Sequence, residues 1–428
     1  MPTRQDCVRV RRTIITVAAV LVGALLAGCG SSSSKGPVTL NWYVYPEPSG
    51  SFAYAASTCS KDSGGKYNIV MNLLSTSSDQ QRVSEVRRLA AGDPSIDILA
   101  MDVDWTAEYA TAKWIRPWPA ALAAQVTRGD LPGPVATATW DGKLYAAPLN
   151  SNTEILWYRK DLLADIHQPP PTTWNQMIDD AAELAKMGKP HYIEEQGAQY
   201  EGLTVWFNSL VDSDGGGILT KSNQIIVGPS TEVAASIMHR LATSPAADPS
   251  LNVTEESQSE TAFEHGTAAF QINYPFVWAA AHKDTPAIGK EMGYALFPRV
   301  NPSIAPKVSI GGYNLGVSAF SKHPQLAFDA VRCMIQPQFQ RRDAIKGGLA
   351  PVLGNIYSEP AFIKAYPFSA LIKAQLENYG LRPQTPVYAD VTLAIQLALS
   401  PTSSIDPTSV VSTLRHEIKE ALSSEALL

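Results

Sequence analysis

The feature that most constrains the fold is a regular alternation of strand-like and helix-like segments that begins at residue 38. Strands are expected at 38–45 and 67–73, where β-branched and aromatic residues are frequent, and helices at 52–60 and 79–91. The run from Ile96 to Met101 is almost continuously apolar, which is typical of a strand covered on both faces. This alternation predicts an α/β fold with a mainly parallel sheet.

A second block of predicted elements continues the alternation. Thr173 and Gln176 have the spacing of a capping box and predict a helix from Trp174 to Met187. The tail from residue 360 to 428 is expected to be mostly helical. The remaining strands are expected at 143–149, 155–158, 268–273 and 313–318, and the remaining helices at 203–211, 231–242, 257–265 and 324–335.

Length and charge narrow the class of protein. A chain of 428 residues is too long for one ordinary domain and suggests two to three units. Because no shift in composition marks a linker near the middle, the units are expected to be interleaved in sequence rather than arranged in series. The formal net charge is -6, and a chain without a basic excess is a poor candidate for nucleic-acid binding.

The N-terminus has the pattern of a bacterial lipoprotein leader. Arginines precede an apolar stretch from Thr13 to Ala27 that would be about 22 Å long as a helix, too short for a bilayer core of ~30 Å. The following Leu-Ala-Gly-Cys resembles a lipobox. We therefore expect a signal peptide at 1–28, lipidation of Cys29 and a serine-rich tether at 29–37. The alternative is an uncleaved membrane anchor with a chance cysteine.

Four cysteines divide between the leader and the mature chain. Cys7 falls in the leader and Cys29 would carry lipid, which leaves Cys59 and Cys333. An exported chain in an oxidising space favours a disulfide between these two, with buried free thiols as the alternative. There is no Cys-x-x-Cys, so the sequence does not support a zinc ribbon or a thioredoxin-like centre.

Catalytic and cofactor signatures are missing from the sequence. It contains no P-loop, no His-Glu-x-x-His, no Gly-x-Ser-x-Gly and no Gly-x-Gly-x-x-Gly after a strand. The pair Glu255 and Glu256 does not by itself make a glycosidase couple, because adjacent helical residues do not face one another. We therefore expect a protein that is not an enzyme and has neither a cofactor nor a metal.

Polar and aromatic residues follow the predicted strands or lie in loops. In α/β folds the carboxyl ends of strands line the ligand crevice. Aromatic rings cover the C–H faces of sugars, while Asp, Asn, Glu and Arg side chains hydrogen-bond with hydroxyls. The alternative for any one of them is a turn or helix cap. The residues in such positions are Glu47, Asp102, Asn152, Tyr274, Tyr313, Asn314 and Arg382.

Longer phrases in this order resemble the bacterial extracellular sugar-binding proteins of ABC importers, in the maltose-binding-like group. The phrases are IDILAMDVDWTAEYA, GKLYAAPLNSNTEILWYRKDL, FEHGTAAFQINYPFVWA and GGYNLGVSAFSKHPQLAFDAVRCM. Within that group, EGLTVWFNSLV and LRPQTPVY are similar to the actinobacterial trehalose-binding lipoproteins of the trehalose-recycling importer.

The resemblance implies two interleaved α/β lobes joined by a multi-strand hinge, with a disaccharide such as trehalose held between them. Lobe 1 would comprise 38–149 and about 290–320, and lobe 2 would comprise 150–289 and about 321–428. The protein would be a monomer on the extracytoplasmic face of the membrane, attached through its lipid. Its partners would be ABC permease subunits and their ATPase.

The resemblance also assigns roles to residues. Asp102 and Asn152 would accept sugar hydroxyls from lobe 1 and the hinge, and Arg382 would donate several hydrogen bonds. Glu256 and Tyr274 would contact the sugar from lobe 2, where the close relatives have Trp in place of Tyr274. Glu47 and the segment Gly312, Tyr313 and Asn314 complete the set.

Other functions fit parts of the same pattern. The same fold could bind a malto-oligosaccharide, another disaccharide or a glycerophospho-sugar. A secreted glycosidase would need two opposed carboxylates, which Asp102 and Glu256 could resemble. A structural adhesin would bind no small ligand.

Overall fold

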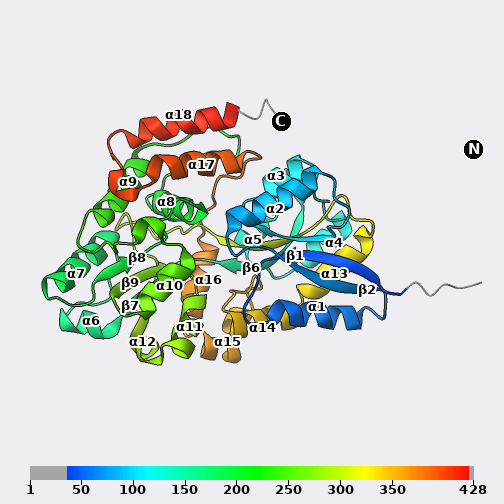
Figure 1. Ribbon diagram of the computed structural model, residues 1–428, viewed down its shortest axis with the longest axis horizontal. Coiled ribbons are helices and arrows are strands. Elements are labelled where there is room, and N and C mark those ends of the chain that lie inside the picture. The colour runs from blue at the N-terminus through cyan, green and yellow to red at the C-terminus, as the bar shows by residue number, and fades with distance from the viewer. Residues whose placement is uncertain (1–35, 424–428) are drawn as a thin grey trace, which may run out of the picture. The chain divides into compact units, whose positions relative to one another are not determined.

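Two β-sheets organise the chain, for which a computed structural model describes residues 36–423 (Figure 1). The larger sheet has the strand order β2-β1-β3-β11-β6, and we name the part of the protein built on it lobe 1. Its strands are β1 (Val38–Val44), β2 (Tyr67–Leu73), β3 (Ile98–Asp102), β6 (Ala146–Asn152) and β11 (Gly311–Val317).

The smaller sheet has the order β10-β7-β9-β8 and is the centre of lobe 2. Its strands are β7 (Ile155–Arg159), β8 (Tyr192–Glu194), β9 (Ala268–Asn273) and β10 (Met292–Ala295). A two-stranded ribbon of β4 (Thr139–Trp140) and β5 (Lys143–Leu144) completes the strands of the described residues.

Helices cover both faces of each sheet, which explains why the strands are so apolar. The lobe 1 helices are α1 (Ser51–Asp62), α2 (Ser78–Ala90), α3 (Thr106–Thr111), α4 (Ala120–Val126), α5 (Pro132–Thr137), α13 (Pro324–Met334) and α14 (Pro337–Arg342). The lobe 2 helices are α6 (Lys160–Asp165), α7 (Trp174–Lys186), α8 (Glu201–Ser213), α9 (Pro229–Ala242), α10 (Glu256–Glu264), α11 (Phe276–Asp284), α12 (Pro286–Glu291), α15 (Pro360–Ala365), α16 (Ser369–Glu377), α17 (Tyr388–Leu399) and α18 (Val410–Ser423). Short helical turns are η1 (Leu251–Val253), η2 (Asp343–Gly347), η3 (Ile356–Ser358) and η4 (Thr402–Ser404).

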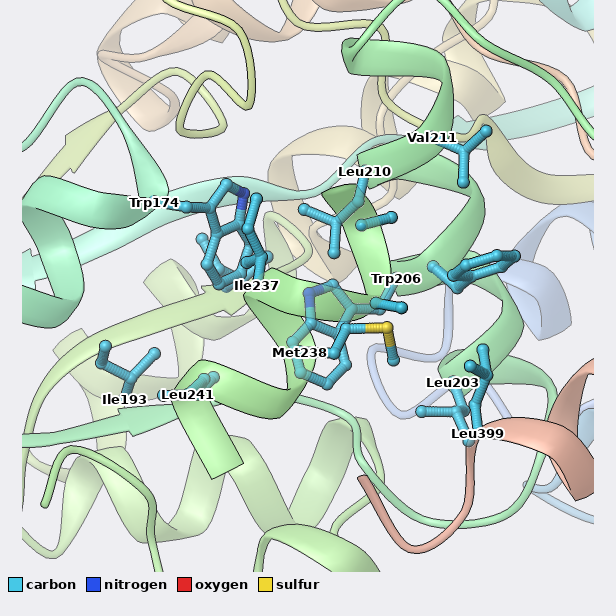
Figure 2. Packing of buried hydrophobic residues seen from close by; sticks show 14 of the residues in the cluster. Trp174, Ile193, Leu203, Trp206, Leu210, Val211, Ile237, Met238, Leu241 and Leu399 are labelled. Atoms are coloured by element: carbon cyan, nitrogen blue, oxygen red, sulfur yellow. The ribbon is translucent and has the colours of Figure 1, made fainter. Parts of the chain in front are cut away.

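The core of lobe 2 shows how the helices are held on their sheet (Figure 2). Trp174 on α7 and Trp206 on α8 are fully buried with ring centroids 5.9 Å apart, and Met238 of α9 packs in the same cluster. The start of α7 is fixed by the Thr173 hydroxyl, which accepts a hydrogen bond from the backbone N–H of Gln176 at 3.2 Å. The Thr173 half of the predicted capping box is therefore confirmed, whereas the Gln176 side chain accepts from the backbone N–H of Thr172 at 3.0 Å instead of that of Thr173. The helix ends one residue earlier than expected.

The sheets are mixed, so the expectation of a mainly parallel sheet was wrong. β1 runs parallel to β2 and β3, but β11 is antiparallel to both β3 and β6. In lobe 2 β8 and β9 are parallel, while β7 is antiparallel to β9 and β10. The reason is that β7 and β11 arrive from the other lobe and enter each sheet at the edge where the parallel strands end.

Three segments carry the chain between the lobes. The first is the pair Thr153 and Glu154 between β6 and β7, and the second runs from residue 296 to 310 between β10 and β11. The third is η2, which lies against helices of both lobes. The expected interleaving with a multi-strand hinge is thus present in the fold.

The division of the chain between the lobes differs from the expected one in two places. β10, which lies within the 290–320 expected in lobe 1, pairs with β7 in lobe 2. Helices α13 and α14, within the 321–428 expected in lobe 2, pack on lobe 1, where Phe328, Val331 and Phe339 join its core. The physical reason is that the apolar faces of α13 and α14 are buried against α1 and the five-stranded sheet.

A disulfide joins Cys59 of α1 to Cys333 of α13, with the two Cα atoms 5.8 Å apart. The predicted pairing is confirmed, and it links segments of lobe 1 that are 274 residues apart in sequence. The expected signal peptide, the lipidation at Cys29 and residues 29–35 of the tether lie outside the described residues. In the described range 36–423, no helix combines the length and apolarity needed to cross a bilayer.

Replacing both Cys59 and Cys333 by serine should destabilise the protein, because the bond restricts the unfolded chain over a long loop. We expect the free energy of unfolding to fall by about 2–4 kcal/mol, measured by denaturant titration of the mature chain. The unsubstituted chain in reducing buffer is the matched control and should show a similar loss. An unchanged midpoint in both would contradict a stabilising role for this bond.

Candidate functional site

In both sheets, the edge at which the parallel strands end faces the junction between the lobes. β3 ends at Asp102 and β6 ends at Asn152, and β11 begins beside them, with Tyr313 opposite Asp102 and Gly311 opposite Asn152. From lobe 2, β9 ends at Asn273 opposite the start of β7. The predicted residues that follow these strands are therefore brought together by the fold.

We define the junction cluster as the six predicted residues that gather at this edge. The Tyr274 ring lies beside Gly311, since a Cβ placed on that glycine would be 3.8 Å from the Tyr274 hydroxyl. Glu256 begins α10, and its backbone carbonyl accepts a hydrogen bond from the Asn273 amide at 3.0 Å. The members of the cluster are Asp102, Asn152, Glu256, Tyr274, Tyr313 and Arg382.

Burial and neighbouring charges change the pKa values of residues in the junction cluster. Burial raises the pKa of Glu256 to about 7, and the nearby carboxylates of Glu255 and Asp102 add to the rise. Burial also raises the pKa of the Tyr274 hydroxyl well above its ordinary value, and Glu154 and Glu256 act in the same direction. Tyr274 therefore stays a neutral hydroxyl that can donate one hydrogen bond and accept others.

Arg382 is buried and already paired with carboxylates of both lobes. Its Nη2 lies 3.0 Å from Asp102 Oδ1, and its Nη1 lies 2.6 Å from Glu201 Oε1. Asp104 Oδ1 is 3.5 Å from Nη1. The sequence predicted Arg382 and Asp102 but not Glu201, which opens a buried helix and carries no strand-end signal.

Gly312, Tyr313 and Asn314 lie in three different environments. Gly312 has a φ of 117°, and a Cβ there would lie 2.4 Å from the carbonyl oxygen of Asn150, so the backbone requires glycine. Tyr313 stacks on Tyr45 at 4.3 Å between centroids, and its hydroxyl donates to the Gln81 side chain at 3.2 Å. Tyr313 thus faces the junction edge of lobe 1.

Asn314 and Glu47 are not among the residues that gather in the junction cluster, although Glu47 lies beside the third crossing segment, where a Cβ placed on Gly347 would be 2.8 Å from Glu47 Oε1. Neighbouring residues of a strand point to opposite faces. Asn314 therefore points away from the Tyr313 side, is buried, and donates to Thr137 at 3.1 Å. Glu47 accepts hydrogen bonds from the backbone N–H groups of Ser49 at 2.7 Å and Ser51 at 2.9 Å, so its carboxylate holds the start of α1.

Two further buried carboxylates lie next to the cluster and were missed from the sequence. Glu154 is on the first crossing segment and Glu195 follows β8, and neither is exposed to solvent. No described residue gives either Glu154 oxygen a well-aligned hydrogen bond, although the Gln196 amide lies nearby. Burial, with Glu256 adding to it, raises the pKa of Glu154 to about 8. Burial, with Glu154 adding to it, likewise raises the pKa of Glu195.

Two α/β lobes, three crossing segments and a polar and aromatic junction define a two-lobed periplasmic-binding-protein fold. The chain belongs to the bacterial extracellular solute-binding protein family, whose model matches residues 65–341. The family description places its members outside the cytoplasm.

Individual relatives agree with this class. A Deinococcus radiodurans protein described as a probable ABC transporter-binding protein is 29% identical over 315 residues, 72% of this chain and 74% of the relative. The diacetylchitobiose binding protein DasA of Streptomyces coelicolor is 25% identical over 258 residues, 59% of this chain and 58% of DasA.

Solved structures show the same fold. Maltose-bound T. maritima MalE3 matches with a TM-score of 0.82 at 24% identity, over 90% of this chain and 99% of MalE3. The GacH receptor of Streptomyces glaucescens GLA.O matches with a TM-score of 0.78 at 19% identity, over 90% of this chain and 99% of the receptor. At these identities the likeness concerns the fold and not the ligand.

Replacing Glu154 by glutamine should flatten the pH dependence of stability. The pKa of Glu154 is about 8 in the folded protein, raised from about 4.5. The folded state therefore holds this proton more tightly than the unfolded state, so stability is highest below pH 4.5 and is lost as the pH rises from there through 8. The free energy of unfolding should therefore fall less steeply across this range in the variant, measured by urea titration at several pH values. Glu232→Gln is the control, because Glu232 is exposed on α9. Equal slopes in Glu154→Gln and the unsubstituted protein would contradict the expectation.

Proposed function

We propose that the protein is the extracellular sugar-binding component of an ABC importer and captures trehalose or a related disaccharide between its lobes. A lipid on Cys29 anchors the mature monomer at the extracytoplasmic face of the membrane, and permease subunits with their ATPase receive the sugar. The protein breaks no bond, so its work is selective binding followed by a shift of the lobes toward a closed state.

The observation that carries this proposal is the mixture of side chains at the junction. Asp102 and Glu256 offer carboxylate oxygens to sugar hydroxyls, and Asn152 offers an amide. The Tyr274 ring beside Gly311 offers an aromatic face for apolar C–H groups. A site of many acceptors and few charges of the opposite sign suits a neutral, hydroxyl-rich ligand.

Trehalose is the first sugar to test because the phrases around Glu201 and Arg382 resemble trehalose-binding lipoproteins. The relatives named above point to the wider class, since their names refer to diacetylchitobiose and maltose. A malto-oligosaccharide in the same site is therefore the alternative within this fold.

Substitutions at the lobe 2 side of the junction should weaken sugar binding. Above its pKa of about 7 Glu256 is ionised, and Glu256→Gln then removes a charged acceptor. A hydrogen bond to a charged group contributes about 1.5–3 kcal/mol, so affinity measured above that pKa should fall about tenfold or more. Tyr274→Ala should act in the same direction by removing the stacking face. A thermal-shift panel of sugars followed by calorimetry with trehalose measures both effects.

Glu260→Gln is the matched control because Glu260 lies one turn further along the same helix as Glu256. Its affinity should equal that of the unsubstituted protein. Stabilisation by another sugar and not by trehalose would move the proposal to that sugar. Glucose released from trehalose would instead favour a glycosidase.

The charge at the junction should exclude phosphorylated sugars. Asp79 at the start of α2 lies in the field of Glu201, Asp102 and Glu255, and these carboxylates outnumber the guanidinium of Arg382. Trehalose 6-phosphate carries nearly two negative charges at pH 7 and should bind at least about tenfold more weakly than trehalose, a difference of about 1.4 kcal/mol. Competition calorimetry measures the ratio, and equal or tighter binding of the phosphate would contradict this charge argument.

A further inference from the structure

Arg382 occupies a hinge position that the sugar-binding role does not explain. Two residues before it, Gly380 pairs with the second crossing segment: its N–H donates to Val308 at 2.8 Å, and its carbonyl accepts from Ile310 at 3.0 Å. The Arg382 side chain therefore starts beside the hinge rather than within either sheet. Only 5% of the residue is exposed.

The guanidinium of Arg382 divides its contacts between the two lobes. Asp102 at the end of β3 belongs to lobe 1, and Glu201 at the start of α8 belongs to lobe 2. Each pairs with a different terminal nitrogen, at 3.0 Å and 2.6 Å, and Asp104 of lobe 1 lies 3.5 Å from the nitrogen that contacts Glu201. One side chain on the hinge thus ties a fixed point of one lobe to a fixed point of the other.

Glu201 is held within lobe 2 and is committed to this network. Its Oε1 also accepts a hydrogen bond from the Tyr388 hydroxyl, and its Oε2 accepts one from Thr392 Oγ1 at 2.7 Å. Tyr388 and Thr392 both lie on α17, so two helices of lobe 2 position the carboxylate. This leaves Glu201 a structural partner of Arg382 rather than a group aimed at a ligand.

Separating these charges is costly where they are buried. Breaking a buried ion pair leaves an uncompensated charge in a poorly solvated place, whereas charge-assisted hydrogen bonds of this geometry are among the stronger ones. Moving the lobes apart must break the contact of Arg382 with Asp102 or with Glu201, unless the hinge moves with it. The network therefore favours the arrangement in which both contacts are made.

We propose that Arg382 is a positioning residue that latches the lobes by pairing Asp102 with Glu201, and that this latch sets how much of the protein is closed before ligand arrives. The proposal rests on the proposed function only in placing the ligand at the junction. Apparent affinity falls when the binding-competent state is less populated, so weakening the latch at Glu201 lowers affinity without removing a ligand contact.

Glu201→Gln tests the latch because it keeps the size and shape of the side chain, removes its charge and replaces one acceptor oxygen by an NH2 donor. We expect the ligand-free variant to have a larger radius of gyration by small-angle X-ray scattering than the unsubstituted protein. We also expect its affinity for trehalose to fall about fivefold or more. Arg382→Lys should change both quantities in the same direction, because an ammonium cannot reproduce the two-sided fork.

Glu108→Gln is the matched control, since Glu108 forms a 2.6 Å ion pair with Arg82 inside lobe 1. It should leave the radius of gyration and the affinity unchanged. If Glu201→Gln does not fold, judged by near-ultraviolet circular dichroism, Arg382→Lys carries the test. An unchanged radius of gyration in the folded latch variants would overturn the proposal. This comparison needs no ligand, so a failure of every sugar to bind would count against the proposed function and not against the latch.

Discussion

The structure depends on one constraint: the two crossings that join strands, β6 to β7 and β10 to β11, leave and enter the sheets at the edges that face the junction. β6 leaves lobe 1 there and β11 returns there, while β7 starts and β10 ends at the facing edge of lobe 2. This arrangement requires mixed sheets. It also places the residues after β3, β6 and β9 around one junction, so the candidate site is a consequence of the connectivity.

Local elements could be predicted from the sequence because their signals are local. The apolar run from Ile96 to Met101 and the cap at Thr173 both predicted elements close to those observed. Strand direction and lobe membership could not be predicted from the sequence, since they depend on which sheet a segment joins. The expected lobe boundaries even conflicted with the expected disulfide, because they placed Cys59 and Cys333 in different lobes. The predicted disulfide was correct and the predicted boundary was not, because the bond joins α1 and α13 within lobe 1.

Residues of the candidate site could be predicted from the sequence where the end of a strand places them at the junction, but not elsewhere. Asp102 and Tyr274 follow strands and lie at the junction, whereas Asn314 is one residue out of phase and points into lobe 1. Glu47 also follows a strand, but the turn after it uses its carboxylate as a cap. Glu201 has no pattern of its own. Its role follows from a contact with Arg382, 181 residues away in sequence, which no local pattern reports.

The excess of carboxylates at the junction opposes closure of the lobes when no ligand is bound and favours closure when a ligand is bound. Without a ligand, ionised carboxylates in this poorly solvated place are unfavourable: burial above all, and neighbouring carboxylates in addition, raises the pKa values of Glu154 and Glu256. Arg382 offsets part of this cost on the hinge side. A hydroxyl-rich ligand supplies donors to the remaining accessible acceptors, so it lowers the free energy of the closed arrangement more than that of the open one. The same charges that oppose empty closure thereby make closure responsive to a ligand.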